Sequence, residues 1–497
     1  MKWLVLLYFL ALLFIGGWAS RKIEGVEDYI VAGRNLGFLA FTILVVGSIC
    51  SGMTILGVAG LGYIAGWPTI WEQIFVPLSA AFCILFLGTK LHRIGKQYNY
   101  LTIQDYFSHR FYSKKKIRLI SAIVGIAVSL IYLVGQYTAI SIVLTWLLGI
   151  THVQALTIAS TIVVFYVLLG GLYAVAWTTL VQGIILIIGV LLLSPPIIEK
   201  AGGLTHINRI LSMIDPNFVK LAYPQVHPPY ANYAFCTPAF IISLFFLLVF
   251  GLASAPHVIN NVLAAKEKKY FKFSPFLAFS LYVIIMYLIK LSGFAVRAMA
   301  YEGHLKVPRP DYAFIVGVEH VLNPFAWSIF AVVVLAAVMS TTDRLLFTIG
   351  TYFGWDIYRL LKSNVSQQEL TLVSRIAILA SAIVSLILAI NPPKLLAWLI
   401  WMGIGIMLSS FTIPLIAGLY WKRATKEGAI ASMASGFFTA IVFGYIHKFV
   451  YPLPMHFSFF SFGISFITMV VVSILTPPPP EKIIKETKTG TFILGEN

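Results

Sequence analysis

Long runs of apolar residues recur along the whole chain and are separated by short polar segments. Most of these runs approach the roughly 20 residues that a helix needs to cross a bilayer, and they are continuous rather than alternating, unlike the strands of an outer-membrane barrel. The pattern therefore predicts an all-α integral membrane protein with about 13 transmembrane helices, at 2–19, 37–64, 70–91, 119–149, 152–174, 177–197, 237–263, 274–300, 324–350, 372–390, 394–420, 427–447 and 456–475.

Composition and the distribution of charge also predict how the chain is oriented in the membrane. Of the 497 residues, 59% are hydrophobic and only 11% are charged, and the net charge of +17 is concentrated in the short segments between apolar runs. That distribution indicates a lipid bilayer rather than a nucleic acid as the partner. With the N-terminus outside, 24 of the 35 Lys and Arg residues lie on the inner side and 8 on the outer side. The positive-inside rule thus predicts a plasma-membrane protein whose C-terminus is cytoplasmic.

Two of the predicted spans carry residues that interrupt helices. The second span contains Gly47 and Gly52, and the seventh contains Gly251, Ser254 and Pro256. Small residues also let membrane helices pack closely, which is the alternative explanation. The two segments are five spans apart and therefore run in opposite directions, as the broken helices of an inverted-repeat transporter do. A proline in a span frees a carbonyl that needs a new partner.

A third segment is rich in hydroxyl groups inside a span. Ser340, Thr341 and Thr342 are consecutive and are followed by Asp343 and Arg344. Sodium, like other hard cations, prefers oxygen ligands, and carbonyls from a broken helix together with two hydroxyls would supply them. The alternative is that these hydroxyls bond back to carbonyls of their own helix.

Six separated segments carry a more specific signal. They read EDYIVAGRNLG (27–37), SICSGMTILGVAG (48–60), YLTIQDYFSHRF (100–111), GGLYAVAWTTLVQG (170–183), APHVINNVLAAK (255–266) and AAVMSTTDRLL (336–346). With these motifs the chain resembles the solute:sodium symporters, which include proline, pantothenate, monocarboxylate and sodium/glucose carriers. The resemblance implies a LeuT-type core of two inverted five-helix repeats. The expected organisation is a peripheral first span and linker (1–36), a first repeat (37–200), an outer loop (201–235), a second repeat (236–421), two final spans (422–476) and a short, mobile cytoplasmic tail (477–497).

The resemblance also implies a sodium site between the first and eighth core helices. Carried onto this chain, its ligands would be the carbonyl oxygens of Gly47, Cys50 and Ala337 and the hydroxyls of Ser340 and Thr341.

Two departures from the family bear on the number of ions. Some members have an Asp where this chain has Thr179, and a Ser where it has Arg344, and such residues can help to form a second sodium site. Because this chain lacks that carboxylate and carries a fixed cation, we expect one coupling sodium ion. Arg344 is expected to pair with Asp343 or to reach the cytoplasmic interface. Asn261 replaces an Arg of the family pattern, and nothing in the sequence explains that change.

Lys290 is the main candidate for binding the solute. A lysine deep in a span indicates a functional site, because burying its charge in the membrane is costly. In sugar-carrying relatives a Lys at the matching place contacts substrate. It is placed either to pair with a solute carboxylate or to snorkel to the outer interface. Further candidates lie at the helix breaks and at the head of the third span: Ser51, Gly52, Thr54, Glu72, Ser254 and His257.

The expected function is sodium-driven symport of a small organic solute by alternating access, with a carboxylate or an amino acid preferred and a sugar as the alternative. Proton coupling through Asp343 or His257 is the rival mechanism. No pattern for a metal-dependent, Ser-His-Asp or phosphate-loop enzyme occurs, and the three cysteines have no framework spacing. We therefore expect neither enzymatic activity nor a cofactor other than Na⁺, and no feature requires an oligomer.

Overall fold

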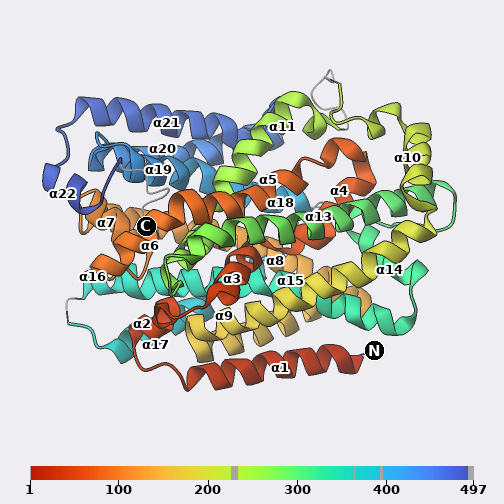
Figure 1. Cartoon of the computed structure of the whole chain (residues 1–497), viewed down its shortest axis with the longest axis horizontal. Coiled ribbons are helices and arrows are strands. Elements are labelled where there is room, and N and C mark those ends of the chain that lie inside the picture. Colours follow the sequence, from red (N-terminus) through yellow and green to blue (C-terminus); the bar gives the residue numbers. More distant parts are fainter. Residues whose placement is uncertain (1, 225–232, 363, 392–395, 491–497) are drawn as a thin grey trace.

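The computed structural model describes residues 2–224, 233–362, 364–391 and 396–490. In this part of the chain the regular secondary structure is helical except for one isolated bridge between Leu36 and Ala265. Most of the helices run along the long axis of the molecule (Figure 1). One end carries the short helices α7 (Ile103–Arg110), α16 (Arg359–Leu361) and α22 (Glu481–Glu486). We call this end the tail face. The opposite end carries α10 (Gly203–Ile214) and α14 (Ala313–Val321).

Within the described residues, ten helices are long and apolar enough to cross a membrane. They are α1 (Lys2–Ser20), the run Trp67–Tyr98 that holds α5 and α6, α8 (Lys116–Leu148), the second part of α9 (Gly170–Lys200), α13 (Tyr270–Tyr301), α15 with its continuation (Pro324–Leu361), α17 (Gln367–Ala389), α18 with α19 (Leu396–Tyr420), α20 with its continuation (Lys426–Val450) and α21 (Phe457–Leu475).

Helix α9 (His152–Lys200) corresponds to two predicted spans. A straight helix of its 49 residues would measure about 73 Å at 1.5 Å per residue, against a hydrocarbon core of about 30 Å. It is interrupted at Gly171, where φ is 49°, after the shorter apolar segment His152–Leu168. A side chain at Gly171 would also collide with the ring of Tyr29, at 2.5 Å from a built Cβ. This glycine therefore marks the turn between the fifth and sixth predicted spans.

The two remaining spans are broken helices, as the sequence predicted. Helix α3 (Phe38–Ile49) and the segment Met53–Ala65, which ends in α4 (Val58–Ala65), are bent by 64°. The segment Pro238–Gly251, which begins with α11 (Pro238–Phe245), and the segment Pro256–Ala264, which begins with α12 (Pro256–Ile259), are bent by 42°. All thirteen predicted runs thus correspond to helical segments, and the helix-break prediction is confirmed.

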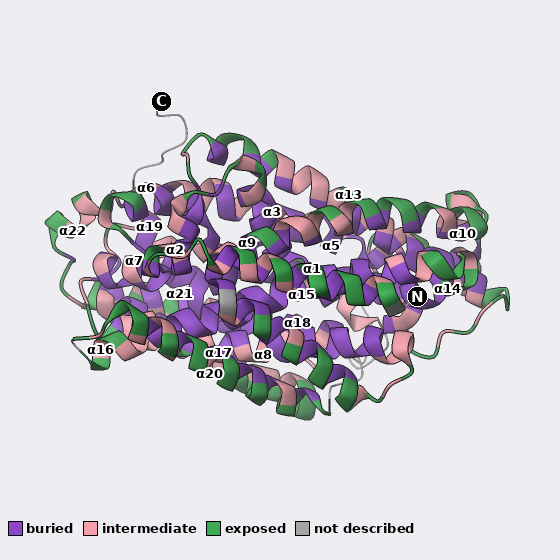
Figure 2. Ribbon diagram, turned by 90° about the horizontal axis from the view of Figure 1, so that it is seen from below, coloured by how far each residue is buried: buried purple, intermediate pink, exposed green. Residues whose placement is uncertain are grey.

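Helix α15 forms the centre of the bundle. It packs against α1, α8, α9 and α17, and 78% of its apolar window is buried. By contrast, α20 and α21 are each 28% buried, because they pack mainly against one another at the edge opposite α1 (Figure 1). Figure 2 shows the same arrangement as a buried interior with exposed residues on the outer helices. The exposed apolar side chains of these outer helices are those that lipid would cover.

The described part of the tail is folded, which differs from the mobile segment expected from its polar sequence. His109 Nε2 of α7 lies 2.9 Å from Glu486 Oε2 of α22. Further on, the amide of Gly490 donates to the carbonyl of Leu419 at 3.1 Å, and the hydroxyl of Thr489 donates to that of Gly418 at 3.3 Å. The tail satisfies carbonyls at the end of α19 (Ile413–Tyr420), a long-range role that its composition does not reveal. Residues 491–497, like 225–232 of the predicted outer loop, lie outside the described part.

A crossing between α13 and α4 gives a direct test of this packing. A Cβ on Gly293 would lie 2.2 Å from the carbonyl oxygen of Ala59. We expect Gly293→Ala to destabilise the protein by about 1–3 kcal/mol through overpacking. Thermal unfolding in detergent measures this as a lower melting temperature. Gly463→Ala in α21 is the matched control, because no atom lies within 4 Å of its built Cβ. Equal melting temperatures for the two variants would contradict the assigned crossing.

Candidate functional site

The break between α3 and α4 faces the middle of α15. Ser340 Oγ donates to the carbonyl oxygen of Gly47 at 3.0 Å and to that of Ala337 at 2.9 Å. Thr341 Oγ1 donates to the carbonyl oxygen of Cys50 at 2.5 Å and to that of Gly47 at 3.2 Å. All five predicted ligand groups therefore converge on one buried point, although they come from segments about 290 residues apart.

Local sequence explains why the carbonyls are available. Cys50 has an extended backbone (φ −66°, ψ 115°), so α3 ends there and its last carbonyls lack helical partners. Gly47 also permits a close approach of α9, since a built Cβ would lie 2.4 Å from Thr179 Cγ2. Thr342 differs from its two neighbours, because among the described residues its hydroxyl donates only to Val338 of its own helix, at 2.8 Å, and does not reach the helix break. The back-bonding alternative therefore describes Thr342 fully and Ser340 in part, since Ser340 bonds to Ala337 of its own helix and also reaches the helix break, as Thr341 does.

The neighbouring charged residues do not pair as the sequence analysis expected. The carboxylate of Asp343 accepts hydrogen bonds from Tyr166 at 3.1 Å and Thr178 at 3.4 Å, both on α9. No ion pair within the described residues joins Arg344 to Asp343, and Arg344 is 1% exposed, so it does not reach an interface either. Adjacent helical residues point about 100° apart, which directs the two side chains to different neighbours.

A small central cavity lies beside the break. Its volume is about 20 Å³, enough for roughly one water molecule, so a solute fits only if the site opens. Of the predicted solute residues, Ser51, Thr54 and Glu72 line it. Several other lining residues were not predicted from the sequence, chiefly Tyr132, Tyr282, Met286 and Trp401. Helical spacing offered one signal, because Tyr282 and Met286 lie two turns and one turn before Lys290 on the same face of α13.

Lys290 forms a buried ion pair at the edge of this cavity. Its Nζ lies 3.3 Å from Glu72 Oε2 and donates to Thr69 Oγ1 at 3.0 Å. The lysine is fully buried and therefore does not snorkel to an interface. Gly62 makes room for its stem, because a built Cβ there would lie 2.9 Å from Lys290 Cδ. Pairing the two charges greatly lowers the cost of burying either one alone.

The remaining predicted solute residues lie around the cavity without lining it. The amide of Gly52 donates to Gln136 Oε1 at 3.0 Å, and the hydroxyl of Ser254 is 2.6 Å from that of Thr412. The ring of His257 lies 5.4 Å from that of Tyr132, which does line the cavity. The contact of His257 with Tyr132 therefore joins the second helix break to the central cavity.

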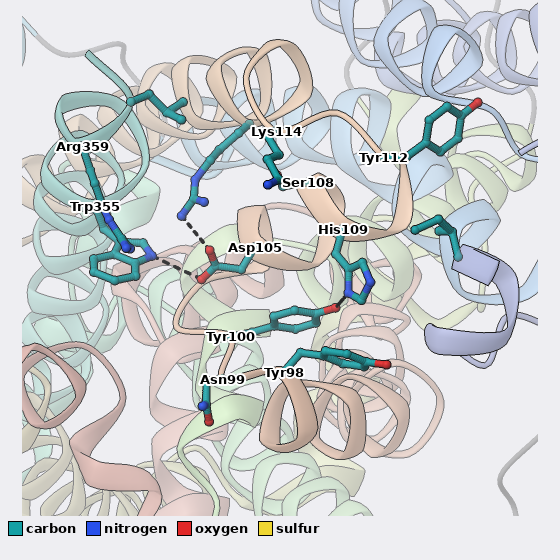
Figure 3. Close-up of a pocket in the computed structure, with 13 residues that line it drawn as sticks. Tyr98, Asn99, Tyr100, Asp105, Ser108, His109, Tyr112, Lys114, Trp355 and Arg359 are labelled. Atoms are coloured by element: carbon teal, nitrogen blue, oxygen red, sulfur yellow. Dashed lines mark hydrogen bonds and ion pairs between the residues drawn. The ribbon is translucent and has the colours of Figure 1, made fainter. Parts of the chain in front are cut away.

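A much larger cavity, of about 830 Å³, opens at the tail face. Figure 3 shows Tyr98, Tyr100 and His109 on one wall, Trp355 and Arg359 on the other, and Asp105 between them. This cavity was not predicted from the sequence, because it forms where the segment from α6 to the start of α8 meets α16 with the residues just before it, and α22, which are remote from that segment in sequence.

Comparison with known proteins places these features in a family. The model of the sodium:solute symporter family matches residues 29–436. The chain is 26% identical over 444 residues to the osmoregulated proline transporter OpuE of Bacillus subtilis, covering 88% of this chain and 87% of that protein. It is 27% identical over 489 residues to the sodium/proline symporter of Escherichia coli, covering 95% and 92% of the two chains.

Solved structures show the same fold. A Na⁺-coupled sialic acid symporter superposes with a TM-score of 0.77 at 19% identity, covering 96% of this chain and 98% of that one. MhsT, solved with L-phenylalanine, superposes with a TM-score of 0.51 at 13% identity, covering 88% and 98%. These similarities confirm the LeuT-type fold expected from the motifs. The chain is a multi-pass membrane transporter that belongs to the sodium:solute symporter family.

Proposed function

We propose that this transporter couples the inward movement of one Na⁺ ion to the uptake of a small organic solute that carries a carboxylate, by alternating access. The observation that supports this most directly is the convergence of the Ser340 and Thr341 hydroxyls on the Gly47 and Cys50 carbonyls. Five uncharged oxygen atoms around one buried point suit a monovalent hard cation. An ion bound there would hold α3 and α15 together and so favour one conformation over another.

The proposal of a single ion rests on the neighbourhood of this point. Thr179 Oγ1 is buried and has no hydrogen-bond partner among the described residues, and no carboxylate replaces it on α9. Arg344 already carries a fixed positive charge one turn along α15 from Ser340. A second sodium ion near that guanidinium would be repelled in a low dielectric.

The nature of the solute is inferred from Lys290 and Glu72. A carboxylate entering the central cavity would compete with Glu72 for the Lys290 ammonium, which favours an acidic or zwitterionic solute. The names of the relatives point the same way, because they are proline transporters, and proline is the first solute to try. A sugar is the alternative, since Glu72 can accept and Lys290 can donate hydrogen bonds to hydroxyl groups.

Orientation follows from the positive-inside rule, because most of the loop Lys and Arg residues lie toward the tail face. We therefore place the tail face in the cytoplasm and the N-terminus outside. A negative interior potential would then add about 2.3 kcal/mol per 100 mV to the inward movement of each positive charge.

Proton coupling is the second candidate mechanism. Its support is the buried carboxylate of Asp343, whose Oδ1 has no hydrogen-bond partner in the described structure. Uptake that needs a sodium gradient and continues when a protonophore is present would exclude it. Uptake that follows the pH gradient in the absence of sodium would exclude our first proposal instead.

The sodium site is tested by ligand-induced stabilisation. We expect NaCl, but not KCl, to raise the melting temperature of the wild type, because a ligand of the folded state stabilises it by about 2.7 kcal/mol at 100 times its Kd. Ser340→Ala should abolish most of this shift by removing one ligand. Thr342→Ala is the matched control, since its hydroxyl bonds only within its own helix among the described residues. Full sodium stabilisation of Ser340→Ala would show that the site lies elsewhere.

The ion pair is tested by a double substitution. Lys290→Met leaves the buried Glu72 carboxylate without its counter-charge and should destabilise the protein by about 3–5 kcal/mol. Adding Glu72→Gln should restore most of the melting temperature. Binding of L-proline, followed by scintillation proximity, should remain absent in the double variant because no cation is left to receive the carboxylate. Proline binding that survives in the double variant would remove Lys290 from the solute site.

A further inference from the structure

A column of buried polar groups without partners runs from the central cavity toward the tail face. Within the described residues its members have at least one side-chain nitrogen or oxygen that is buried and makes no hydrogen bond: His257, Asn261, Arg344, Thr351, Gln104 and Asp356. Unsatisfied polar atoms are costly inside a bilayer, where water does not reach them. Such a series of polar groups is expected along a solute path that is closed in one conformation and filled with water in another.

The upper end of the column adjoins the central cavity. The ring of His257 packs beside that of Tyr132, and both of its ring nitrogens are unpartnered in the described structure. Next to it, Asn261 Nδ2 donates to Ser48 Oγ at 2.8 Å, while its Oδ1 accepts nothing from the described residues. A solute leaving the central cavity toward the tail face would meet these two side chains first.

The lower end of the column reaches the 830 Å³ cavity through a polar network. Asn260 Nδ2 donates to Tyr352 Oη at 2.9 Å, and Thr102 Oγ1 donates to Asp356 Oδ1 at 3.0 Å. Arg118 bridges Asp356 at 2.8 Å and Asp105 at 2.6 Å. Asp105 and Arg118 both line this cavity, and Figure 3 shows Asp105 within it. The column is therefore bounded by a cavity at each end.

Arg344 lies between these two ends and is the one charged member without an ion pair in the described structure. Its Nε and Nη1 are buried and make no hydrogen bond there, and its guanidinium carbon lies 5.8 Å from the centre of the Phe347 ring. The nearest carboxylate, Asp343, is directed toward Tyr166 and Thr178 instead. His257 and Tyr352 are the titratable groups on its other sides. A permanent cation buried in this way is an incomplete site for an anion.

We propose that Arg344 is a second anion-binding station, which receives the carboxylate of the solute after it leaves Lys290 and before it enters the cavity at the tail face. This inference rests on the proposed function, in which the solute carries a carboxylate. It adds a second binding residue for that carboxylate and a path from Lys290 to the cavity at the tail face. The Arg118 bridge closes the route at its lower end, and opening it hydrates the column. A chloride ion could also bind the Arg344 guanidinium. The experiments below therefore distinguish chloride from the solute carboxylate.

The deciding experiment measures access and charge preference without any solute. Thr351 is two turns from Arg344 on the same face of α15, and its hydroxyl is also unpartnered in the described part of the chain. The thiol of Thr351→Cys is treated in sodium-free membranes with an anionic sulfonate or a cationic ammonium methanethiosulfonate, and modification at position 351 is counted by mass spectrometry. This counting keeps the native Cys50, Cys83 and Cys236 in place.

We expect the thiol to react, and we expect the ratio of anionic to cationic rates to fall about tenfold when Arg344→Gln is added, because one unit charge at close range acts strongly in a low dielectric. Arg344→Lys should keep most of the ratio. Arg375→Gln, which removes an exposed arginine of α17, should not change it. A thiol that reacts with neither reagent, or a ratio unchanged by Arg344→Gln, would overturn the proposal.

A transport measurement then distinguishes solute from chloride. In proteoliposomes, Arg344→Gln should lower the maximal rate of sodium-driven L-proline uptake at least about tenfold while leaving the half-saturating external concentration unchanged. The same loss is expected in chloride-free gluconate buffer. A wild-type rate that requires chloride would assign Arg344 to the inorganic ion and overturn the solute role. If the wild type shows no sodium-driven uptake, the proposed function fails, whereas the labelling result still decides the role of Arg344.

Discussion

Every polar group inside a bilayer needs a partner, and the arrangement of this bundle follows from how that need is met at two broken helices. The break after Ile49 releases carbonyl oxygens in the interior, and the hydroxyls of Ser340 and Thr341 meet them from α15. A helix that supplies such partners must itself lie in the middle. Accordingly, 78% of the apolar window of α15 is buried, and α8, α9 and α17 pack around it.

The sequence predicted the structural features that depend on neighbouring residues. It did not predict those that depend on contacts between distant segments. The thirteen apolar runs and both breaks were visible because span length, glycine and proline act on their own segment. Pairing the first break with α15 required the family resemblance. The ion pair between Glu72 and Lys290 joins residues that are 218 positions apart, and no pattern in either segment predicts it. The docking of the tail on α19 and the cavity at the tail face were missed for the same reason.

The interior handles its charges in two different ways. Glu72 and Lys290 form an ion pair beside the central cavity, so each compensates the charge of the other. Arg344 is left without a carboxylate, since Asp343 turns toward hydroxyl groups of α9. The ion pair offsets the cost of burying its two charges, whereas the unpaired guanidinium raises the free energy of this conformation. A transporter needs both kinds of contribution, because conformations that exchange readily must be close in free energy.

The hydrogen bonds at the helix break have a consequence for ion affinity. The same carbonyl lone pairs that would coordinate Na⁺ are occupied by the Ser340 and Thr341 hydroxyls, which must rotate and give up those bonds before an ion can enter. If Na⁺ binds at this proposed site, binding would be an exchange of ligands rather than the filling of a preformed cage. The affinity of that site would be the difference between coordination of the ion and internal hydrogen bonding, so the bonds that the ion replaces would set the sodium concentration at which the site fills.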